Sequence, residues 1–309
     1  MIINTGARTD IPAFFSTWFL NRIKEGFVYV RNPYYPKQVA KYSLTPNVVD
    51  CLIFCTKNPQ PILPRIHKLD AFTSYWFVTI TPYGKDVEPN VPPVDQVISD
   101  FRLLSQELGS HRVCWRYDPI FINEHYSVER HIEDFRKMAN ELSGYTDECV
   151  ISFIDLYKKT KRNFPGIREV DAEKKIQLAK EFSQIGKQYN ISLKTCAEAA
   201  DLRQYGIQSS GCITQTIMEK AIGMKLKNTH SKPNRANCGC CIPNRDIGAY
   251  NTCPHGCKYC YANYDQETVK HNMRMHDPKS PLLIGQLSDS DIVHAAVQES
   301  YVDGQLPLF

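Results

Sequence analysis

Short apolar runs rich in β-branched and aromatic residues recur along the first two-thirds of the chain and predict strands. These runs are Met1–Asn4, Val48–Cys55, Tyr75–Thr81, Arg112–Tyr117, Cys149–Leu156 and Ile191–Thr195. Helical patterns lie between most of them, over Ala13–Lys24, Val94–Leu108, Ser127–Leu142 and Asp171–Tyr189. Strands that alternate with helices of this length predict parallel pairing with right-handed crossovers.

The ends of the predicted helices carry recognisable signals. Asp10, Ser127 and Asp171 are suited to accept a hydrogen bond from the first turn of a helix. Gly26 and Gly109 follow predicted last turns, where glycine is favoured. Six strand and helix units predict a partial or complete α/β barrel, and a flat doubly wound sheet is the alternative that periodicity leaves open.

The alternating pattern ends near residue 198 and so divides the chain into two predicted regions. Beyond it lie loops, one predicted helix over Thr214–Ile222 and a basic stretch containing proline over Lys225–Arg235. We expect a (βα)6 barrel core over residues 1–198 and a cysteine-rich cap over residues 199–309.

The composition is that of an ordinary globular protein. The chain has 309 residues, of which 42% are hydrophobic, enough to bury a core in one large domain with a smaller appendage. Its 37 basic and 33 acidic residues give a net charge of +4, too close to balance to indicate a nucleic-acid partner. No secretory signal begins the sequence, and no apolar run approaches the roughly 20 residues of a membrane helix. We therefore expect a cytoplasmic protein without membrane association.

Polar side chains gather where the predicted strands end. Active sites of parallel barrels lie at the carboxyl ends of their strands. The residues at these ends include Asn4, Lys57, Asn58, Arg116, Asp118, Asp155 and Glu198. We expect Arg116 and Asp118, in the run W-R-Y-D-P, to form a pair set over a cavity. For any single residue of this set, capping of the next helix or contact with water is the alternative.

Three cysteines lie close together late in the chain. Cys253, Cys257 and Cys260 have C-x3-C-x2-C spacing on a segment interrupted by proline and glycine. Thiolates on such an irregular loop can converge on one inorganic centre. On a four-iron cluster, three protein ligands leave the fourth iron for an external ligand, which chemistry at the metal requires. A zinc knuckle completed by His255 or by a fourth cysteine is the alternative.

The chain has 12 cysteines, and in a reducing cytosol they are better explained by metal binding than by disulfides. Cys196, Cys212, Cys238 and Cys240 are together expected to form a second site with thiolate ligands only. A second four-iron cluster, a structural zinc ion and unligated buried thiols are all compatible with this set. Four other cysteines lie on predicted strands and are expected to pack in the core, namely Cys51, Cys55, Cys114 and Cys149.

Seven sequence blocks in one order resemble an uncharacterised family of proteins related to the radical S-adenosylmethionine (radical SAM) superfamily. The blocks are R-T-D-I-P from Arg8, T-K-N-P from Thr56, T-I-T-P-Y-G-K from Thr79, W-R-Y-D-P from Trp115, D-L-Y-K-K from Asp155, T-C-A-E from Thr195 and D-I-G-A-Y from Asp246. Two places depart from the family pattern. Thr5-Gly6-Ala7 precedes Arg8 where the family tends to have a serine and a second arginine, and Cys55 replaces a tryptophan.

This resemblance implies a partial TIM-like barrel of radical SAM type. Cys253, Cys257 and Cys260 would hold a 4Fe–4S cluster, and S-adenosylmethionine would bind its open iron. One electron would then release a 5'-deoxyadenosyl radical that takes hydrogen from the substrate. In most of the superfamily the cluster cysteines follow the first strand, so here residues 236–263 are expected to fold back over the barrel mouth.

The resemblance also implies roles for individual residues. Tyr259 matches an aromatic residue that packs near the adenine of the cofactor. The other residues expected to bind the cofactor are Asn4, Lys57 and Asn58, and the candidate catalytic residues are Arg116, Asp118, Asp155 and Glu198. An enzyme of this kind requires an external electron donor of flavodoxin or ferredoxin type.

The substrate and further partners are open. A nucleic-acid lesion or modified base, by analogy with spore photoproduct lyase, and a small metabolite are both compatible. Lys158, Lys159, Lys161 and Arg162 could bind phosphates, although solvated surface charge is the more common role. Gln305–Phe309 resembles the peptide by which bacterial repair and replication proteins bind the sliding clamp, or it packs on its own domain. The alternative function is a non-catalytic iron–sulfur or zinc protein associated with the clamp or with nucleic acid.

Overall fold

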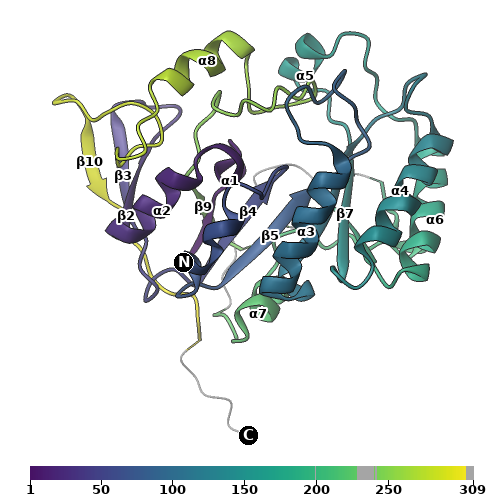
Figure 1. Cartoon of the computed structure of the whole chain (residues 1–309), viewed down its shortest axis with the longest axis horizontal. Coiled ribbons are helices and arrows are strands. Elements are labelled where there is room, and N and C mark those ends of the chain that lie inside the picture. Colours follow the sequence, from purple (N-terminus) through teal and green to yellow (C-terminus); the bar gives the residue numbers. More distant parts are fainter. Residues whose placement is uncertain (199, 228–239, 241, 304–309) are drawn as a thin grey trace, which may run out of the picture.

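Seven parallel strands form the central sheet of the computed structural model, which describes residues 1–198, 200–227, 240 and 242–303 (Figure 1). Their order across the sheet is β8-β7-β6-β5-β4-β1-β9. The bounds are Ile2–Asn4 for β1, Cys51–Thr56 for β4, Ser74–Thr79 for β5, Val113–Ile120 for β6, Glu148–Phe153 for β7, Ser192–Thr195 for β8 and Asn244–Asp246 for β9. Strands β1 and β4 to β8 correspond to the six predicted runs, so the mixed α/β class is confirmed.

Strands β1 and β4 to β8 stand in the sheet in the order in which they occur along the chain. A doubly wound sheet reverses its strand order at a switch point; these six strands show no reversal, although β9 lies on the other side of β1. Within the described residues β8 and β9 are the two free edges, so the complete, closed barrel is wrong. The predicted sheet lacked β9, which comes from the segment assigned to the cap and pairs in parallel with β1.

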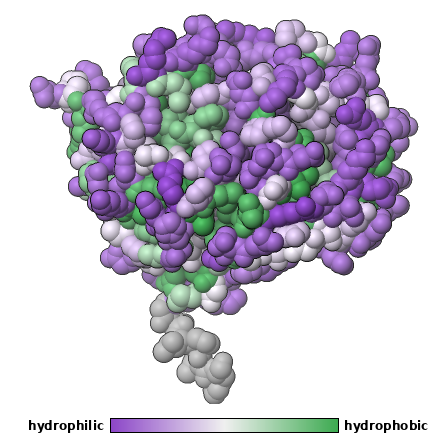
Figure 2. All heavy atoms as spheres, viewed as in Figure 1, coloured by the Kyte–Doolittle hydropathy of each residue, from purple (hydrophilic) through white to green (hydrophobic). Residues whose placement is uncertain are grey.

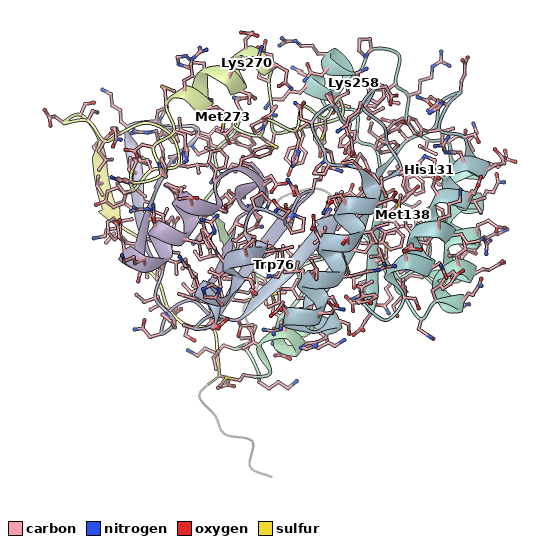
Figure 3. All side chains as sticks on the ribbon, viewed as in Figure 1. Trp76, His131, Met138, Lys258, Lys270 and Met273 are labelled. Carbon is pink, nitrogen blue, oxygen red and sulfur yellow. The ribbon has the colours of Figure 1, made fainter. Side chains whose placement is uncertain are left out.

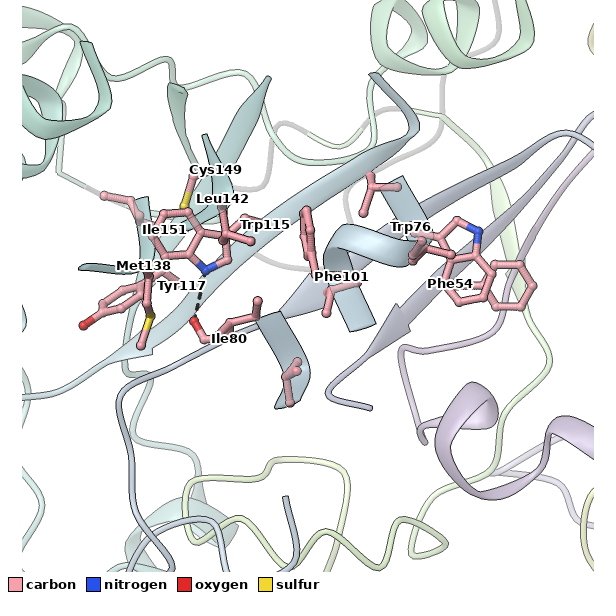
Figure 4. Packing of buried hydrophobic residues seen from close by; sticks show 14 of the residues in the cluster. Phe54, Trp76, Ile80, Phe101, Trp115, Tyr117, Met138, Leu142, Cys149 and Ile151 are labelled. Atoms are coloured by element: carbon pink, nitrogen blue, oxygen red, sulfur yellow. Dashed lines mark hydrogen bonds between the residues drawn. The ribbon is translucent and has the colours of Figure 1, made fainter. Parts of the chain in front are cut away.

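The inner strands are buried on both faces, as is usual in parallel sheets. All residues of β4 except Cys55, and all residues of β5 except Thr79, are buried. Across these strands Phe54 stacks on Trp76 with 3.9 Å between ring centroids (Figure 4).

Helices cover both faces of the sheet (Figure 1). One face carries α2 (Ser16–Glu25), α3 (Val94–Leu108), α4 (Val128–Leu142) and α6 (Ala172–Gln188). On this face Phe135 of α4 stacks on Phe182 of α6 and on Trp115 of β6, at 4.0 and 4.6 Å between centroids. The opposite face packs against α7 (Gln215–Ile222) through Ile217 and Met218.

Most predicted helices are confirmed, with one correction. Ser127 and Asp171 cap α4 and α6 through backbone amides 3.2 and 2.9 Å away. The helix predicted over Ala13–Lys24 is instead two helices, α1 (Ile11–Phe14) and α2, because the backbone of Phe15 is not helical, with φ of −128°.

Several shorter elements were not predicted. A second sheet has three strands in the order β10-β3-β2, with bounds Ile292–Ala295, Gln38–Ser43 and Phe27–Arg31. Two more helices are α5 (Lys158–Asn163) and α8 (Gln266–Arg274). Three 3-10 helices cover Leu63–Leu69, Ser110–Arg112 and Arg203–Tyr205. Both α5 and α8 lie along the upper edge of the molecule in Figure 1.

The surface in Figure 2 is mainly hydrophilic, with apolar patches between polar regions. Within the described ranges, every helix is too short or too polar to span a bilayer.

Candidate active site

The cysteine loop, which we define as residues 251–264, lies over the carboxyl ends of β1 and β5. Lys258 N donates to Val87 O at 3.0 Å, and Asn90 N donates to His255 O at 3.1 Å. Tyr261 Oη donates to Ala7 O, just beyond β1, at 2.6 Å. Figure 3 shows Lys258 beside α5. Residues 251–263 of the segment predicted to return to the strand ends therefore do so, whereas β9 of the same segment lies in the sheet as an edge strand.

The loop is held in shape by side-chain contacts with its own backbone and with the backbone just before it. Asn263 Nδ2 donates to Cys253 O at 2.7 Å, and Thr252 Oγ1 donates to Ala249 O at 2.7 Å. Gly256 has a φ of +73°, and a Cβ there would lie 3.2 Å from Gln266 Nε2. Glycine is favoured at this turn because side chains rarely adopt this backbone conformation.

The three thiols of the loop have the chemistry of metal ligands. Cys253, Cys257 and Cys260 are partly buried. Burial raises the pKa of Cys253 well above its ordinary value, and Asp10 and the other two cysteines raise it further. Deprotonated thiols of one site repel one another unless a cation is bound between them. The donor set therefore fits a metal centre.

His255 is engaged by other protein groups. Its Nε2 lies 2.9 Å from Asp10 Oδ2, and its Nδ1 lies 3.4 Å from Asn90 O. Asp10 is itself fixed, because it caps α1 and accepts a hydrogen bond from Lys57 N at 2.8 Å. Both ring nitrogens of His255 therefore face protein oxygens. In this arrangement His255 is not available as the fourth ligand of a zinc knuckle.

The spacing of the loop thiols also differs from that of a single-ion site. Thiolates on one tetrahedral zinc ion lie about 3.8 Å apart, because each Zn–S bond is about 2.3 Å long. Among the described residues, Cys253, Cys257 and Cys260 are not part of any group of three donors within 4.8 Å of one another. Thiolates on different irons of a cluster stand farther apart than those on one ion.

Glu88, which the sequence did not single out, joins three of the surrounding elements. It is 3% exposed and accepts hydrogen bonds from Lys57 Nζ at 2.9 Å and Thr81 Oγ1 at 2.7 Å. Tyr259 Oη of the cysteine loop donates to the same carboxylate oxygen. Burial lowers the pKa of Lys57, but Glu88 and Cys257 outweigh it and raise the pKa above its ordinary value. Lys57 is therefore a largely buried cation next to Cys257.

Arg116 and Asp118 of β6 form an ion pair within the sheet, and Asp118 also accepts from Ser152 Oγ at 2.9 Å. Arg116 extends over the Phe77 ring, with Cζ 5.5 Å from the centroid. Its Nη1 lies 3.9 Å from Cys212 Sγ. The two residues pair as predicted, and the cavity expected beneath them stays a prediction. Arg116 also reaches the second group of cysteines.

The other predicted site residues make local contacts at the strand ends. Asn4 Nδ2 donates to Asn244 Oδ1 of β9 at 3.3 Å, and Asn58 Oδ1 accepts from Gln60 N at 3.3 Å. Glu198 accepts from Phe153 N at 2.7 Å and from Lys175 Nζ at 3.2 Å, and its burial raises its pKa. Asp155 is exposed and accepts from Tyr157 Oη at 3.2 Å. Their catalytic or cofactor roles stay predictions.

The second group of thiols comprises Cys196, Cys212 and Cys240. Cys212 Sγ lies 3.5 Å from Cys196 Sγ and 3.4 Å from Cys240 Sγ. Cys238, predicted to belong to this group, lies outside the described residues, as does the clamp-like segment Gln305–Phe309.

The two departures from the family pattern touch each other. A Cβ on Gly6 would lie 2.4 Å from Cys55 Cβ, so the segment after β1 approaches the end of β4 too closely for a side chain at position 6. Burial raises the pKa of the Cys55 thiol to about 12. Cys55 therefore behaves as a packing residue, as predicted for the strand cysteines.

Fold and site together define an α/β protein with a seven-stranded parallel sheet and two groups of thiols, one of them at the carboxyl edge. The chain belongs to the family described as domain of unknown function DUF1848, whose model matches residues 2–262. Among curated proteins, none matches the chain.

One solved structure with a weak likeness is a Bacteroides thetaiotaomicron protein assigned as an alpha-L-fucosidase. It is 11% identical, covers 53% of this chain and 50% of its own, and has a TM-score of 0.29. The chain thus spans about half the length of that protein. A likeness this weak carries no conclusion about fold or activity.

Proposed function

We propose that this protein is a radical SAM enzyme whose 4Fe–4S cluster is held by Cys253, Cys257 and Cys260. The observation that carries the proposal is that a loop with three thiols lies over the strand ends, while the histidine of this loop contacts Asp10. A cluster bound by three thiolates keeps one iron for an external ligand, and the carboxyl edge of a parallel sheet is where α/β enzymes bind substrates.

The topology of the sheet supports the same proposal. The sequential order of β1 and β4 to β8, in a sheet with two free edges among the described residues, is what a partial barrel of radical SAM type requires. In such a barrel the residues on the inner side of β6, including Arg116 and Asp118, face the reaction space.

Bound to S-adenosylmethionine, such a cluster supplies the electron that releases a 5'-deoxyadenosyl radical for hydrogen abstraction. The surrounding residues hold this centre in place. Lys57 offsets the negative charge of the thiolates, since it is buried beside Cys257. Glu88 fixes both Lys57 and Tyr259, with Lys57 Nζ 5.7 Å from the centroid of the tyrosine ring. A rigid arrangement of this kind shields a radical from water and from other side chains.

The rim beside the loop favours an anionic substrate, in line with a nucleic acid. Arg162 Cζ lies 4.1 Å from the ring centroid of Tyr264, which is 51% exposed. Tyr250 has two cations over its ring, Lys159 at 5.2 Å and Arg8 at 5.7 Å. The fold brings Tyr264 of the cysteine loop, and Tyr250 just before the loop, next to Arg162 and Lys159 of α5. Aromatic faces between cations suit stacked bases and phosphates.

The proposed reaction is tested by its nucleoside product. The protein is reconstituted with iron and sulfide without oxygen, reduced with dithionite or with a flavodoxin or ferredoxin system, and incubated with S-adenosylmethionine. We expect 5'-deoxyadenosine from the natural protein and none from Cys257→Ser. The matched control is Cys51→Ala, a buried cysteine at the opposite end of β4.

The outcome decides between two functions. An intact cluster in the natural protein that yields no 5'-deoxyadenosine would favour the non-catalytic metal protein. Equal yields of 5'-deoxyadenosine from Cys257→Ser and from the natural protein would show that the loop cysteines do not take part in the reaction.

A further inference from the structure

A second thiol group stands apart from the cysteine loop. Its three cysteines come from three distant segments: Cys196 follows β8, Cys212 precedes α7 and Cys240 precedes β9. Cys196 and Cys212 are 3% and 5% exposed, and Cys240 is partly buried. Among the described residues, these are the one set of three donors whose ligand atoms all lie within 4.8 Å of one another.

The distances distinguish the kinds of centre that three thiols can form. The sulfur–sulfur distances of 3.5 and 3.4 Å are far longer than the roughly 2.05 Å of a disulfide. They are close to the roughly 3.8 Å between two thiolates on one tetrahedral ion. In a four-iron cluster each thiolate binds its own iron, which separates the sulfur atoms farther. The spacing therefore matches three ligands on one ion.

Neighbouring groups are arranged to stabilise charged sulfur atoms. The amides of Cys212 and Ile213 both donate to Cys240 Sγ at 3.2 Å. Arg116 Nη1 lies 3.9 Å from Cys212 Sγ. Three thiolates and a divalent ion carry a net charge of −1, and the partly buried guanidinium of Arg116, which also pairs with Asp118, adds positive charge beside them. Hydrogen bonds to a thiolate and a compensating cation are typical of the surroundings of a bound metal.

The donor type narrows the choice of metal. Thiolates are soft ligands that select zinc, iron and similar ions over magnesium or calcium. A site of this kind would tie the end of β8 to the segments on both sides of α7, which together cover one face of the sheet.

We propose that Cys196, Cys212 and Cys240 bind a single zinc ion, separate from the cluster of the cysteine loop, and that Arg116 stabilises the thiolates as a neighbouring cation. This site does not depend on the radical reaction. Its fourth ligand is a further donor or a water molecule, because the described residues supply three.

Metal analysis of anaerobically purified variants tests the proposal. We expect one zinc ion per chain in the natural protein. Cys212→Ser should lose the zinc and keep its iron, whereas Cys257→Ser should lose iron and keep zinc. Cys51→Ala should keep both metals. If Cys212→Ser loses iron and the natural protein contains no zinc, the second group holds a cluster and the proposal is wrong.

Two further measurements cover the case in which Cys212→Ser does not fold. Protein produced with cobalt in place of zinc should show thiolate-to-cobalt charge-transfer absorption, which Cys257→Ser retains. Arg116→Gln should bind zinc about 10- to 100-fold more weakly in competition with a chelator, as expected for a residue beside the ligands. Absence of the cobalt absorption would overturn the proposal. So would natural protein that is purified without zinc, combined with a zinc affinity that is unchanged in Arg116→Gln.

Discussion

Glu88 binds three donors that come from different parts of the chain. Lys57 follows β4, Thr81 follows β5 and Tyr259 belongs to the cysteine loop. Removing the carboxylate leaves the ammonium group of Lys57 buried without its partner, which is more costly than removing the whole pair.

We predict that Glu88→Ala lowers the free energy of unfolding by about 3 kcal/mol, because a buried ion pair is broken. Urea unfolding without oxygen measures this loss. The double variant Lys57→Met/Glu88→Leu should recover part of it, since no charge is left unpaired. A double variant less stable than Glu88→Ala would show that the ion pair is not the source of the effect.

His131 on α4 is a buried neutral histidine. Its Nδ1 lies 2.7 Å from Tyr117 Oη and its Nε2 lies 2.8 Å from Phe121 O. Burial lowers the pKa of His131 below its ordinary value of 6.5. His131 therefore becomes protonated near pH 6.5 in the unfolded chain but only at a lower pH in the folded protein. Stability is lost as the pH falls below 6.5, because protonation then favours the unfolded chain.

We predict that His131→Asn reduces this loss of stability between pH 7.5 and 5.5, although the variant is less stable overall. Each unit of the pKa difference accounts for about 1.4 kcal/mol. The control is His67→Asn, whose side chain is exposed. If the two variants show the same pH dependence, His131 is not the group responsible.

At the scale of elements, the sequence predicted the long amphipathic helices and buried strands well. Helix α3 has the predicted bounds, and α4 and α6 begin where the capping residues indicated. β9 was missed because it is short and polar, with the sequence N-R-D, and its pairing with β1 spans most of the chain. The break at Phe15 was missed because apolar periodicity continues across it.

The cap of α6 offers a test at this scale. We predict that Asp171→Ala lowers the stability by about 1 kcal/mol, because the amide of Lys174 loses its acceptor. Glu173→Ala, in the first turn of the same helix, should change stability by less than half as much. Thermal unfolding of both variants measures the difference. Equal losses would mean that helix charge, not the cap, is responsible.

At the scale of the whole molecule, the two ends of the described chain are joined. The N-terminal ammonium group pairs with Asp50 and donates to Glu299 O at 2.7 Å. Trp18 Nε1 donates to Ser280 O at 2.9 Å. The candidate active site is likewise assembled from both ends of the sequence. Strand-end residues and loop cysteines could be recognised from sequence, but Glu88 could not, because its loop has no periodicity and its partners are distant.

The rim of the cysteine loop predicts binding of a polyanion. We expect Lys159→Glu/Arg162→Glu to bind a fluorescent single-stranded oligonucleotide at least about tenfold more weakly, with a shallower dependence on salt. The control, Lys137→Glu/Lys174→Glu, makes the same charge change on exposed residues of α4 and α6. Equal weakening of binding in both double variants would mean that net charge, and not this rim, causes the effect. If the natural protein does not bind the oligonucleotide, a small molecule is favoured as the substrate.

The central claim is an iron–sulfur cluster with one iron open to an external ligand. Electron paramagnetic resonance of the reduced, anaerobically reconstituted protein, recorded before and after addition of S-adenosylmethionine, tests it most directly. We predict a four-iron signal that changes on addition of the cofactor and is absent from Cys253→Ser/Cys257→Ser/Cys260→Ser. A four-iron signal that stays the same with the cofactor, or that persists in the triple variant, would contradict the account.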